Sequence, residues 1–334
     1  MKKLAVLLPT FNAAPYIKES IDSILNQTFA DFDLYVYDDC STDATASIIA
    51  EYTDVRLYYR KNVENLGISK TLNRGLDELL PHYEYIARMD ADDWSYPERF
   101  QKQLDYLEQH PATVLCGTQG YWLKDISQEP SSAWKYPVSH EYIKHYLLFG
   151  ATFNHQSIMF RANFLLENNL RYDEKITTCE DWEFWTRIVK LGSIVNLPEF
   201  LIKCRILPYS NHHSPLNKVR HFQERSNIIS NYWSFFDVNL SPTQIFDFYY
   251  SEEKLSKEEF LKNCTILIQS FNKVKRQTDL VSEEKKIFSY LLARKLLNYW
   301  KRSQVSRSNP VIWWTIIREV RFVNKLKLIK SIIR

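Results

Sequence analysis

The stretch "YEYIARMDADDW", residues 83–94, joins an apolar and aromatic run to a burst of negative charge. The run is typical of a short buried strand, and acids follow it at positions 90, 92 and 93. Carboxylates this close repel one another, so such a cluster is tolerated either in open solvent or around a bound cation. The rest of the chain decides between these two interpretations.

Segments with strand and helix patterns alternate around this stretch. Apolar strands are predicted at 4–8, 33–38, 55–60 and 83–89, and helical spacing follows them at 15–27, 42–52, 69–80 and 97–109. This alternation is typical of a mostly parallel sheet with right-handed crossovers and helices on both faces. The sequence therefore predicts an α/β, Rossmann-like fold.

Polar side chains gather where the predicted strands end. Three clusters follow three of the strands: "PTFN" (9–12), "DDCSTD" (38–43) and "DADD" (90–93). Ligands of open parallel sheets bind outside the carboxyl ends of the strands, so we expect the clusters to meet at one edge. Asp39 is well placed there to accept an N–H from a bound base. The chain has no GxGxxG or GxxxxGK[ST] motif, which counts against a dinucleotide or P-loop site.

Asp90 and Asp92 flank one small residue, and their hard oxygens suit Mg²⁺ or Mn²⁺. An EF-hand is excluded, because Trp94 stands at a ligand position and Ser95 replaces the invariant glycine. The alternative is a solvated acidic turn before the helix that Pro97 begins. A DxD triplet is common by chance, but its position beside two other polar clusters favours the metal site.

A second acidic group, Glu180 and Asp181, begins the predicted helix "EDWEFWTRIVKLG" (180–192). Acids in a first helical turn usually complement the helix dipole, and that role would suffice for one of them. Two adjacent acids followed by Trp182 also resemble a sugar site with a catalytic base, because aromatic faces stack on sugar rings and a carboxylate accepts a hydroxyl proton.

The distribution of turn-forming residues divides the chain. All six glycines lie before residue 193, and ten of the twelve prolines lie at or before Pro215. We therefore expect an α/β domain at 1–215 and a helical extension at 216–334. The net charge of +3 gives no argument for a nucleic-acid partner, and the five scattered cysteines form no CxxC pair, which indicates a reducing compartment. No apolar run reaches the length of a membrane span, so the expected location is cytoplasmic.

The last 34 residues, 301–334, carry nine Lys and Arg against the single acid Glu319, with aromatic and aliphatic residues between them. Two interpretations stay open. The tail packs on the preceding domain with its charges solvated, or it docks on an anionic membrane surface at the inner face of the cytoplasmic membrane.

Several motifs together resemble the family 2 inverting glycosyltransferases, and among them bacterial enzymes that extend lipooligosaccharide or capsule glycans, including β-1,3-N-acetylglucosaminyltransferase-like members. The resemblance covers about residues 3–215 and rests on six stretches: "LPTFNAAPYIKESIDSILNQTF" (8–29), "YVYDDCSTDAT" (35–45), "NLGISKTLNRGLDE" (65–78), "YIARMDADDWSYPERFQKQ" (85–103), "NHQSIMFR" (154–161) and "EDWEFWTRIVKLG" (180–192). It implies a fold of the glycosyltransferase A (GT-A) type.

The resemblance also implies roles for individual residues at the nucleotide end of the site. Pro9, Thr10 and Asn12 would line the nucleotide pocket, and Asp39 would bind the uracil edge. Asp90 and Asp92 would contact the ribose and a Mn²⁺ or Mg²⁺ ion, with Asp93 as an adjacent candidate.

At the acceptor end, Asp181 would be the catalytic base, and His155 either lines the acceptor site or has a structural role. Family members often carry Tyr-Arg-x-His after the last core strand, where this chain reads Cys204-Arg205-Ile206-Leu207. The arginine is kept and the histidine is not, and whether His212 or His213 replaces it stays open.

The predicted function is the transfer of a sugar from UDP-GlcNAc, UDP-GalNAc, UDP-Gal or UDP-Glc to a hydroxyl of a bacterial cell-surface glycan, such as lipooligosaccharide, lipopolysaccharide or capsule. Two alternatives remain: a noncatalytic nucleotide-sugar or glycan-binding protein on the same fold, and a nucleotidyltransferase. Against the first stands Asp181, which a binding relic would not need. Against the second stands the loop after the first strand, which has neither glycine nor an early lysine.

Overall fold

The computed structural model describes residues 2–124, 130–207, 215–251, 255–277 and 281–302, and all structural statements below concern these residues. They form two compact units: Met1–Ile143 with Ala151–Asn217, and Lys144–Gly150 with Lys218–Arg334. The sequence predicted a single boundary after residue 215 and did not foresee that 144–150 belongs with the second unit. His212, His213 and the basic tail from residue 303 onward lie outside the described residues.

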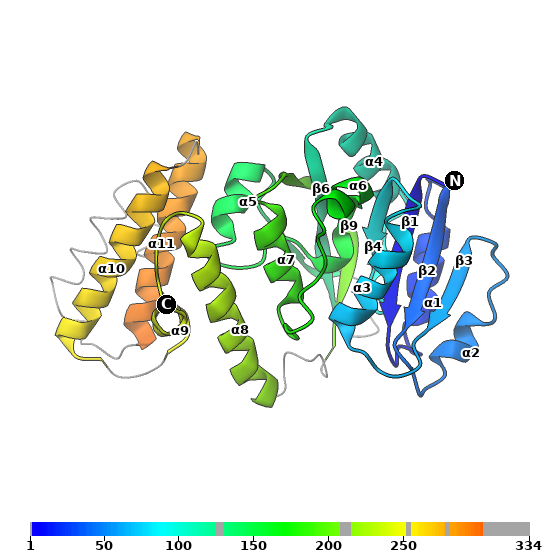
Figure 1. Ribbon diagram of the computed structural model, residues 1–334, viewed down its shortest axis with the longest axis horizontal. Coiled ribbons are helices and arrows are strands. Elements are labelled where there is room, and N and C mark those ends of the chain that lie inside the picture. Colours follow the sequence, from blue (N-terminus) through cyan, green and yellow to red (C-terminus); the bar gives the residue numbers. More distant parts are fainter. Residues whose placement is uncertain (1, 125–129, 208–214, 252–254, 278–280, 303–334) are drawn as a thin grey trace. The chain divides into compact units, whose positions relative to one another are not determined.

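The first half of the first unit contains the predicted alternation. Its elements are β1 (Leu4–Thr10), α1 (Ile17–Leu25), β2 (Phe32–Asp38), α2 (Thr45–Ile49), β3 (Leu57–Lys61), α3 (Ile68–Leu79), β4 (Tyr85–Arg88) and α4 (Arg99–Gln109). β1 pairs in parallel with both β2 and β4, and β2 pairs in parallel with β3 (Figure 1). The strand order therefore reverses between β1 and β4, which is where sheets of this kind bind ligands, outside the carboxyl ends of the strands.

The second half of the unit extends the same sheet with mixed pairing. Its elements are β5 (Trp94–Ser95), β6 (Thr113–Lys124), β7 (Pro130–Trp134), α5 (His140–Tyr146), the 3₁₀ helix η1 (His155–Ser157), β8 (Met159–Arg161), α6 (Ala162–Glu167), α7 (Glu180–Ile188) and β9 (Ser193–Ile206). The complete order is β3-β2-β1-β4-β8-β6-β9-β5, with β7 on β6. β6 and β9 are parallel, whereas β8, β5 and β7 pair antiparallel with their neighbours. The predicted α/β fold is confirmed, with antiparallel strands added in its second half.

The central strands are buried throughout because helices cover both of their faces. Every residue of β1 and β2 is buried. Leu4, Val6 and Leu8 share one core with apolar residues of α1 and α4. On the opposite face, a Cβ added at Gly75 of α3 would lie 2.4 Å from Leu7 Cδ1, so the glycine is what lets α3 approach β1. The polar strand ends are thereby the only parts of these strands left to form a site.

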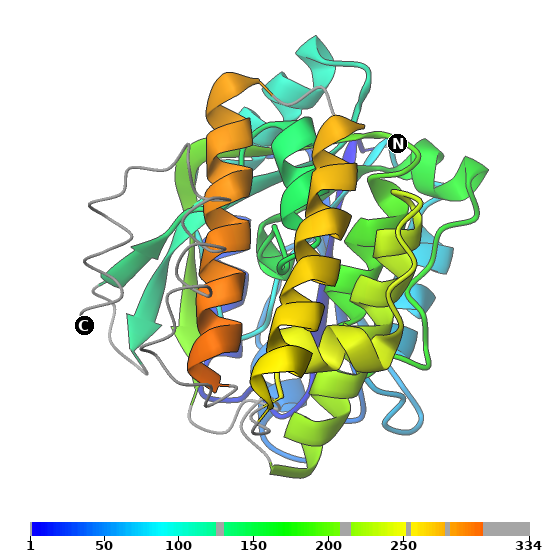
Figure 2. The same cartoon turned by 90° about the vertical axis from the view of Figure 1, so that its left-hand side faces the viewer.

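The second unit is helical in its described part, as predicted. It contains α8 (Pro215–Ser234), α9 (Pro242–Tyr249), α10 (Lys257–Arg276) and α11 (Ser282–Arg302), and α10 and α11 run side by side (Figure 2). The hydroxyls of Tyr232 and Tyr249 donate to the carbonyls of Lys144 and Leu148, which ties the segment 144–150 to this unit. None of the described helices combines the length and apolarity that a membrane span requires.

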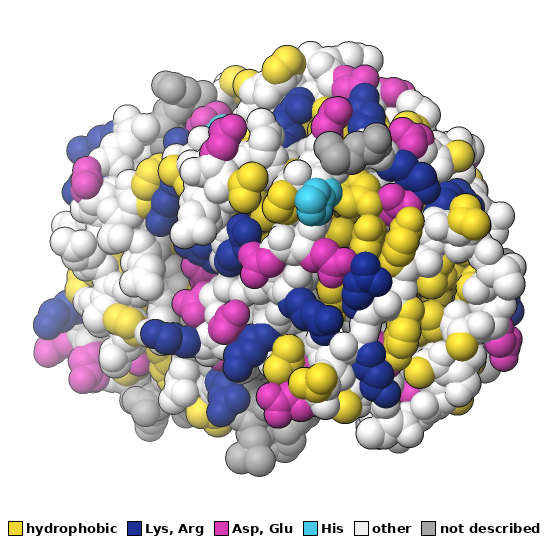
Figure 3. Space-filling view, turned by 45° about the vertical axis from the view of Figure 1, so that its right-hand side comes forward, with side chains coloured by type: hydrophobic (Ala, Val, Ile, Leu, Met, Phe, Trp, Pro, Cys, Tyr) yellow, Lys and Arg dark blue, Asp and Glu magenta, His cyan; other side chains and the backbone are white. Residues whose placement is uncertain are grey.

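Figure 3 shows basic and acidic side chains interspersed over one face of the molecule. Such mixing agrees with the small net charge of +3. This face therefore carries no extended field of a single sign of the kind that attracts a polyanion.

Candidate active site

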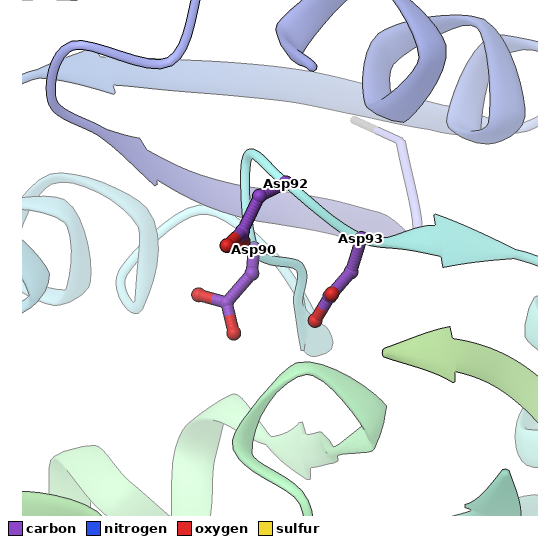
Figure 4. A group of neighbouring side chains, drawn as sticks. All are labelled: Asp90, Asp92 and Asp93. Carbon is purple, nitrogen blue, oxygen red and sulfur yellow. The ribbon is translucent and has the colours of Figure 1, made fainter. Parts of the chain in front are cut away.

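The predicted acidic cluster occupies the turn between β4 and β5. Carboxylate oxygens of Asp90, Asp92 and Asp93 all lie within 4.8 Å of one another, and the three side chains project to the same side of the turn (Figure 4). Asp93 is 3% exposed, so the cluster is not an open, solvated turn. Of the two interpretations of the sequence, the structure favours the one in which a cation offsets the repulsion.

Arg88, the last residue of β4, neutralises one of these acids. Its guanidinium forms an ion pair with both carboxylate oxygens of Asp90, and its side chain is only 4% exposed. The sequence pattern is compatible with this pairing, because residues two apart at a strand end lie on the same face, but it does not single the pairing out. Asp90 is therefore already paired, whereas Asp92 and Asp93 form no ion pair with any described residue.

The pKa values of the two remaining acids reflect this imbalance. Burial, followed by the charge of Asp90, raises the pKa of Asp92 to about 6. Burial, followed by the charges of Asp92 and Asp90, raises the pKa of Asp93 well above its usual range. Around the turn, Arg88 pairs with Asp90 and Arg205 pairs with Glu19 of α1, which leaves two carboxylates uncompensated. A divalent cation fits this deficit in charge, and carboxylate oxygens are the ligands that Mg²⁺ and Mn²⁺ prefer.

Asp39, predicted to bind a base, is buried at the end of β2 and organises the loop beyond β3. Its carboxylate accepts hydrogen bonds from Asn62 Nδ2 at 2.7 Å and from the backbone N–H groups of Leu66 and Gly67, both at 2.8 Å. Gly67 adopts φ +82°, a conformation that favours glycine. A carboxylate has about four acceptor positions, so one remains for a ligand N–H.

The loop after β1 lies next to this carboxylate. The backbone N–H of Asp39 donates to the carbonyl of Thr10. The buried side-chain Oγ1 of Thr10 has no hydrogen-bond partner among the described residues. Asn12 is exposed at φ 50°, and its side-chain oxygen accepts the N–H of Thr42 at 2.8 Å. Pro9 is buried within β1. The loop is thus braced against the end of β2, and an unsatisfied hydroxyl is left where a ligand group could bind it.

The other acidic pair begins α7. Glu180 is 14% exposed, and its Oε1 lies 3.9 Å from His155 Nδ1. Burial and the charge of Arg88 hold the pKa of His155 well below its usual range, so the imidazole is neutral. Its Nε2 shares a 2.7 Å hydrogen bond with the hydroxyl of Tyr172. His155 therefore has a structural partner on one side and faces the acidic pair on the other.

Asp181 is half-buried, and its Oδ1 accepts the backbone N–H of Trp182 at 2.6 Å. Burial, followed by the charge of Asp181, raises the pKa of Glu180 to about 7, and Arg88 and Asp90 also act on this pKa. The strand-end acids and the α7 acids therefore belong to one electrostatic neighbourhood. The fold brings together two groups that are about 90 residues apart in the sequence.

Three comparisons with known proteins identify the family and the fold. The family model described as "Glycosyl transferase family 2" matches residues 5–169. The amylovoran biosynthesis glycosyltransferase AmsE of Erwinia amylovora is 31% identical over 192 residues, which cover 57% of this chain and 70% of that protein. The chain belongs to glycosyl transferase family 2.

Two further matches show how far this likeness extends. An uncharacterized glycosyltransferase of Haemophilus influenzae is 33% identical over 215 residues, and the chain spans 65% of its length. The crystal structure of S. aureus TarS 1–349 in complex with UDP has a TM-score of 0.57 at 21% identity, with 90% of each chain covered, which shows a shared GT-A fold. The chain is a family 2 glycosyltransferase, and the nucleotidyltransferase alternative loses its support.

In this glycosyltransferase, Trp182, which the sequence suggested as a sugar contact, is not exposed to a ligand. Trp182 was expected to offer a face to a sugar ring, but it is 2% exposed and packs in the interior together with Trp185. The two tryptophans are three residues apart and share the apolar face of α7, which is a pattern of core packing.

A residue that the sequence did not indicate completes the wall beside α7. The backbone N–H and carbonyl of Tyr172 bond to the side-chain amide of Asn73 on α3, at 2.8 and 3.0 Å. Tyr172 in turn reaches His155, so α3 positions the surroundings of the α7 acids. No local pattern marks a tyrosine in an irregular segment for such a role.

Glu180→Gln should make stability less dependent on pH. A carboxyl whose pKa is raised from 4.5 to about 7 binds its proton more tightly in the folded state, so stability is lost as the pH rises through that window. The glutamine variant avoids this loss. The urea concentration at its unfolding midpoint should therefore rise relative to that of the wild type between about pH 5 and about pH 8. Glu167→Gln, at an exposed position, is the matched control and should run parallel to the wild type. A Glu180→Gln difference that is equal at both pH values would contradict the assignment.

Proposed function

We propose that this family 2 glycosyltransferase moves a sugar from a UDP-sugar to a hydroxyl group of a bacterial cell-surface glycan, with inversion at the anomeric carbon. The observation that carries the proposal is the cluster of three carboxylates after β4, together with an acid pair on α7 whose Glu180 is affected by the charge of Asp90. Two names support the substrate classes: the Erwinia relative is named for amylovoran biosynthesis, and TarS has been crystallised with UDP and with UDP-GlcNAc. The donor sugar is one of GlcNAc, GalNAc, Gal or Glc.

The nucleotide is proposed to bind between the loop after β1 and the end of β2. Asp39 has one acceptor position left for the uracil N–H, and the buried Thr10 Oγ1 has yet to form a hydrogen bond. Pro9 and Asn12 complete this wall. Asp90, held by Arg88 and still 28% exposed, is the acid left to contact the ribose.

The diphosphate is proposed to lie over Asp92 and Asp93. Breaking the bond between the anomeric carbon and the diphosphate oxygen leaves negative charge on the diphosphate, and a bound Mg²⁺ or Mn²⁺ supplies positive charge there. The two carboxylates would hold the ion, since they carry the uncompensated charge of the turn. Arg205 and Arg88 fix the turn that presents them.

Asp181 is proposed as the catalytic base. It accepts the proton of the acceptor hydroxyl while the hydroxyl oxygen bonds to the anomeric carbon, and the bond to UDP breaks on the opposite face. Its neighbour Glu180 lies beside His155, with Oε1 3.9 Å from Nδ1, and the family resemblance gives the role of base to the second acid of the pair. A single displacement of this kind inverts the anomeric centre.

The acceptor side of the proposal extends to residues that the structure does not describe. A lipid-linked glycan acceptor, and docking of the basic tail on an anionic membrane at the cytoplasmic face, stay predictions from residues 301–334. Co-sedimentation of the full chain with anionic vesicles addresses them.

Asp181→Asn should retain UDP binding but lose transfer by roughly 10²–10⁴-fold, the usual contribution of a general base. Turnover is measured as UDP release with UDP-Glc, UDP-Gal, UDP-GlcNAc and UDP-GalNAc, and UDP binding by calorimetry. Glu180→Gln is the matched variant and should lose less. A dead Glu180→Gln together with a normal Asp181→Asn would show that the pair is assigned in the wrong order.

Asp92→Asn should lower UDP-sugar turnover by about 10²-fold or more without loss of folding, because it removes a charge that stabilises the bound cation. The variant should unfold no earlier than the wild type, since it also relieves repulsion within the turn. Asp105→Asn, at an exposed acid of α4, should behave like the wild type. Full turnover of the wild type in EDTA, or of Asp92→Asn in Mn²⁺, would contradict a required divalent cation at this turn.

A further inference from the structure

Arg205 lies at the end of β9, where this strand runs beside the acidic turn. β9 pairs antiparallel with β5, in the register Trp94 to Lys203 and Ser95 to Ile202, and β5 begins directly after Asp93. The strand pairing therefore carries Arg205 to the turn itself. Its side chain is 1% exposed, so the guanidinium lies inside the protein and does not reach into solvent.

Three hydrogen bonds join Arg205 to the turn and to α1. Its backbone N–H donates to Asp93 Oδ1 at 2.7 Å, and its Nε donates to the carbonyl of Asp92 at 2.9 Å. Its Nη2 forms an ion pair with Glu19 Oε2 at 2.7 Å. The guanidinium also lies 5.0 Å from the centre of the Tyr16 ring. One residue thus holds the carboxylate of Asp93 and the backbone of Asp92, and links both to a helix.

The same helix holds the turn at a second point. Ser20 of α1 donates its hydroxyl to the carbonyl of Asp90 at 2.7 Å. The first turn of α1 therefore contacts the acidic turn directly through Ser20 and indirectly through Glu19 and Arg205. These contacts, together with the pairing of Arg88 with Asp90, hold the spacing of carboxylates that repel one another.

We propose that Arg205 is a positioning residue for the divalent cation: it sets the separation of the Asp92 and Asp93 carboxylates by gripping the turn and by fastening it to α1 through Glu19. The inference rests on the cation site of the proposed function. It gives the arginine that precedes the missing histidine a role in the wall of the site, where it acts through Asp92 and Asp93 and does not touch the diphosphate. A planar guanidinium suits this task, because it donates in two directions at fixed angles, whereas an ammonium does not.

The test measures Mn²⁺ affinity by the electron paramagnetic resonance signal of free Mn²⁺, with UDP at saturation, on folded protein. Arg205→Lys should raise the Mn²⁺ Kd by about ten-fold or more, the usual cost of losing a group that orients metal ligands. UDP binding in EDTA should be unchanged. Glu19→Gln should shift the Kd in the same direction by less, and the double variant should be no worse than Arg205→Lys alone, because both act through one contact.

Arg161→Lys is the matched control. Arg161 lies on β8 of the same sheet and donates from Nε to the carbonyl of Thr113 at 2.8 Å and from Nη1 to the hydroxyl of Tyr85 at 3.0 Å. It has no contact with the acidic turn among its described hydrogen bonds. Its lysine variant should lower the melting temperature and leave the Mn²⁺ Kd unchanged.

These measurements distinguish a failure of the positioning role of Arg205 from a failure of the proposed cation site on which that role rests. A wild-type Mn²⁺ Kd in Arg205→Lys would overturn the positioning role and leave the cation site standing. Failure of the wild type itself to bind Mn²⁺ would overturn both. Should Arg205→Lys not fold, Glu19→Gln decides, because its side chain is 36% exposed and its replacement leaves the core intact; an unchanged Kd there overturns the inference.

Discussion

Asp90, Asp92 and Asp93 place three carboxylates within 4.8 Å of one another, and the surrounding structure has to offset their repulsion. Arg88 pairs with the first acid from within the sheet. Arg205 donates from backbone and side chain to the turn from the far end of the sheet. These contacts compensate part of the charge and leave Asp92 and Asp93 with raised pKa values. The turn therefore lacks positive charge, which the proposed divalent cation would supply.

A second line of contacts runs from the nucleotide side to the acceptor side. Asp39 ties the loop before α3 to the end of β2, and α3 presents Asn73 to the backbone of Tyr172. Tyr172 then bonds to His155, which lies beside Glu180. A single helix, α3, connects these two ends and so links the proposed uracil-binding carboxylate to the surroundings of the proposed base. A donor and an acceptor that react in one step need a defined spacing.

Much of the fold and part of the site could be predicted from local patterns. β1, β2 and β4 are buried on both faces, so they appear as continuous apolar runs, and the acids that end them are visible as breaks in those runs. The positions of Asp39, Asp90 and Asp92 at strand ends follow from this alone. Roles that come only from the family resemblance, such as that of Asp181 as base, are consistent with the geometry but await experiment.

The remaining parts of the site depend on contacts that no local pattern encodes. Arg205 and Glu19 are 186 positions apart, and Asn73 and Tyr172 are 99 apart, so periodicity, which relates neighbours, says nothing of either pair. Trp182 differs from these pairs, because the sequence does contain the reason for its burial. Its spacing from Trp185 places both tryptophans on the core face of α7, and its aromatic character alone does not indicate a sugar contact. The segment 144–150 joins the second unit through hydrogen bonds from α8 and α9, which a composition-based boundary cannot detect.

We expect the turn after β4 to hold a divalent cation at a site shaped by two arginines. Anomalous diffraction from crystals grown with Mn²⁺ and UDP measures this. A manganese peak should lie at about 2.0–2.6 Å from carboxylate oxygens of Asp92 or Asp93, the range of bonds between hard cations and oxygen, with Arg88 still on Asp90 and Arg205 still on the turn. Bound UDP with no manganese at this turn, or manganese held by other residues, would contradict it.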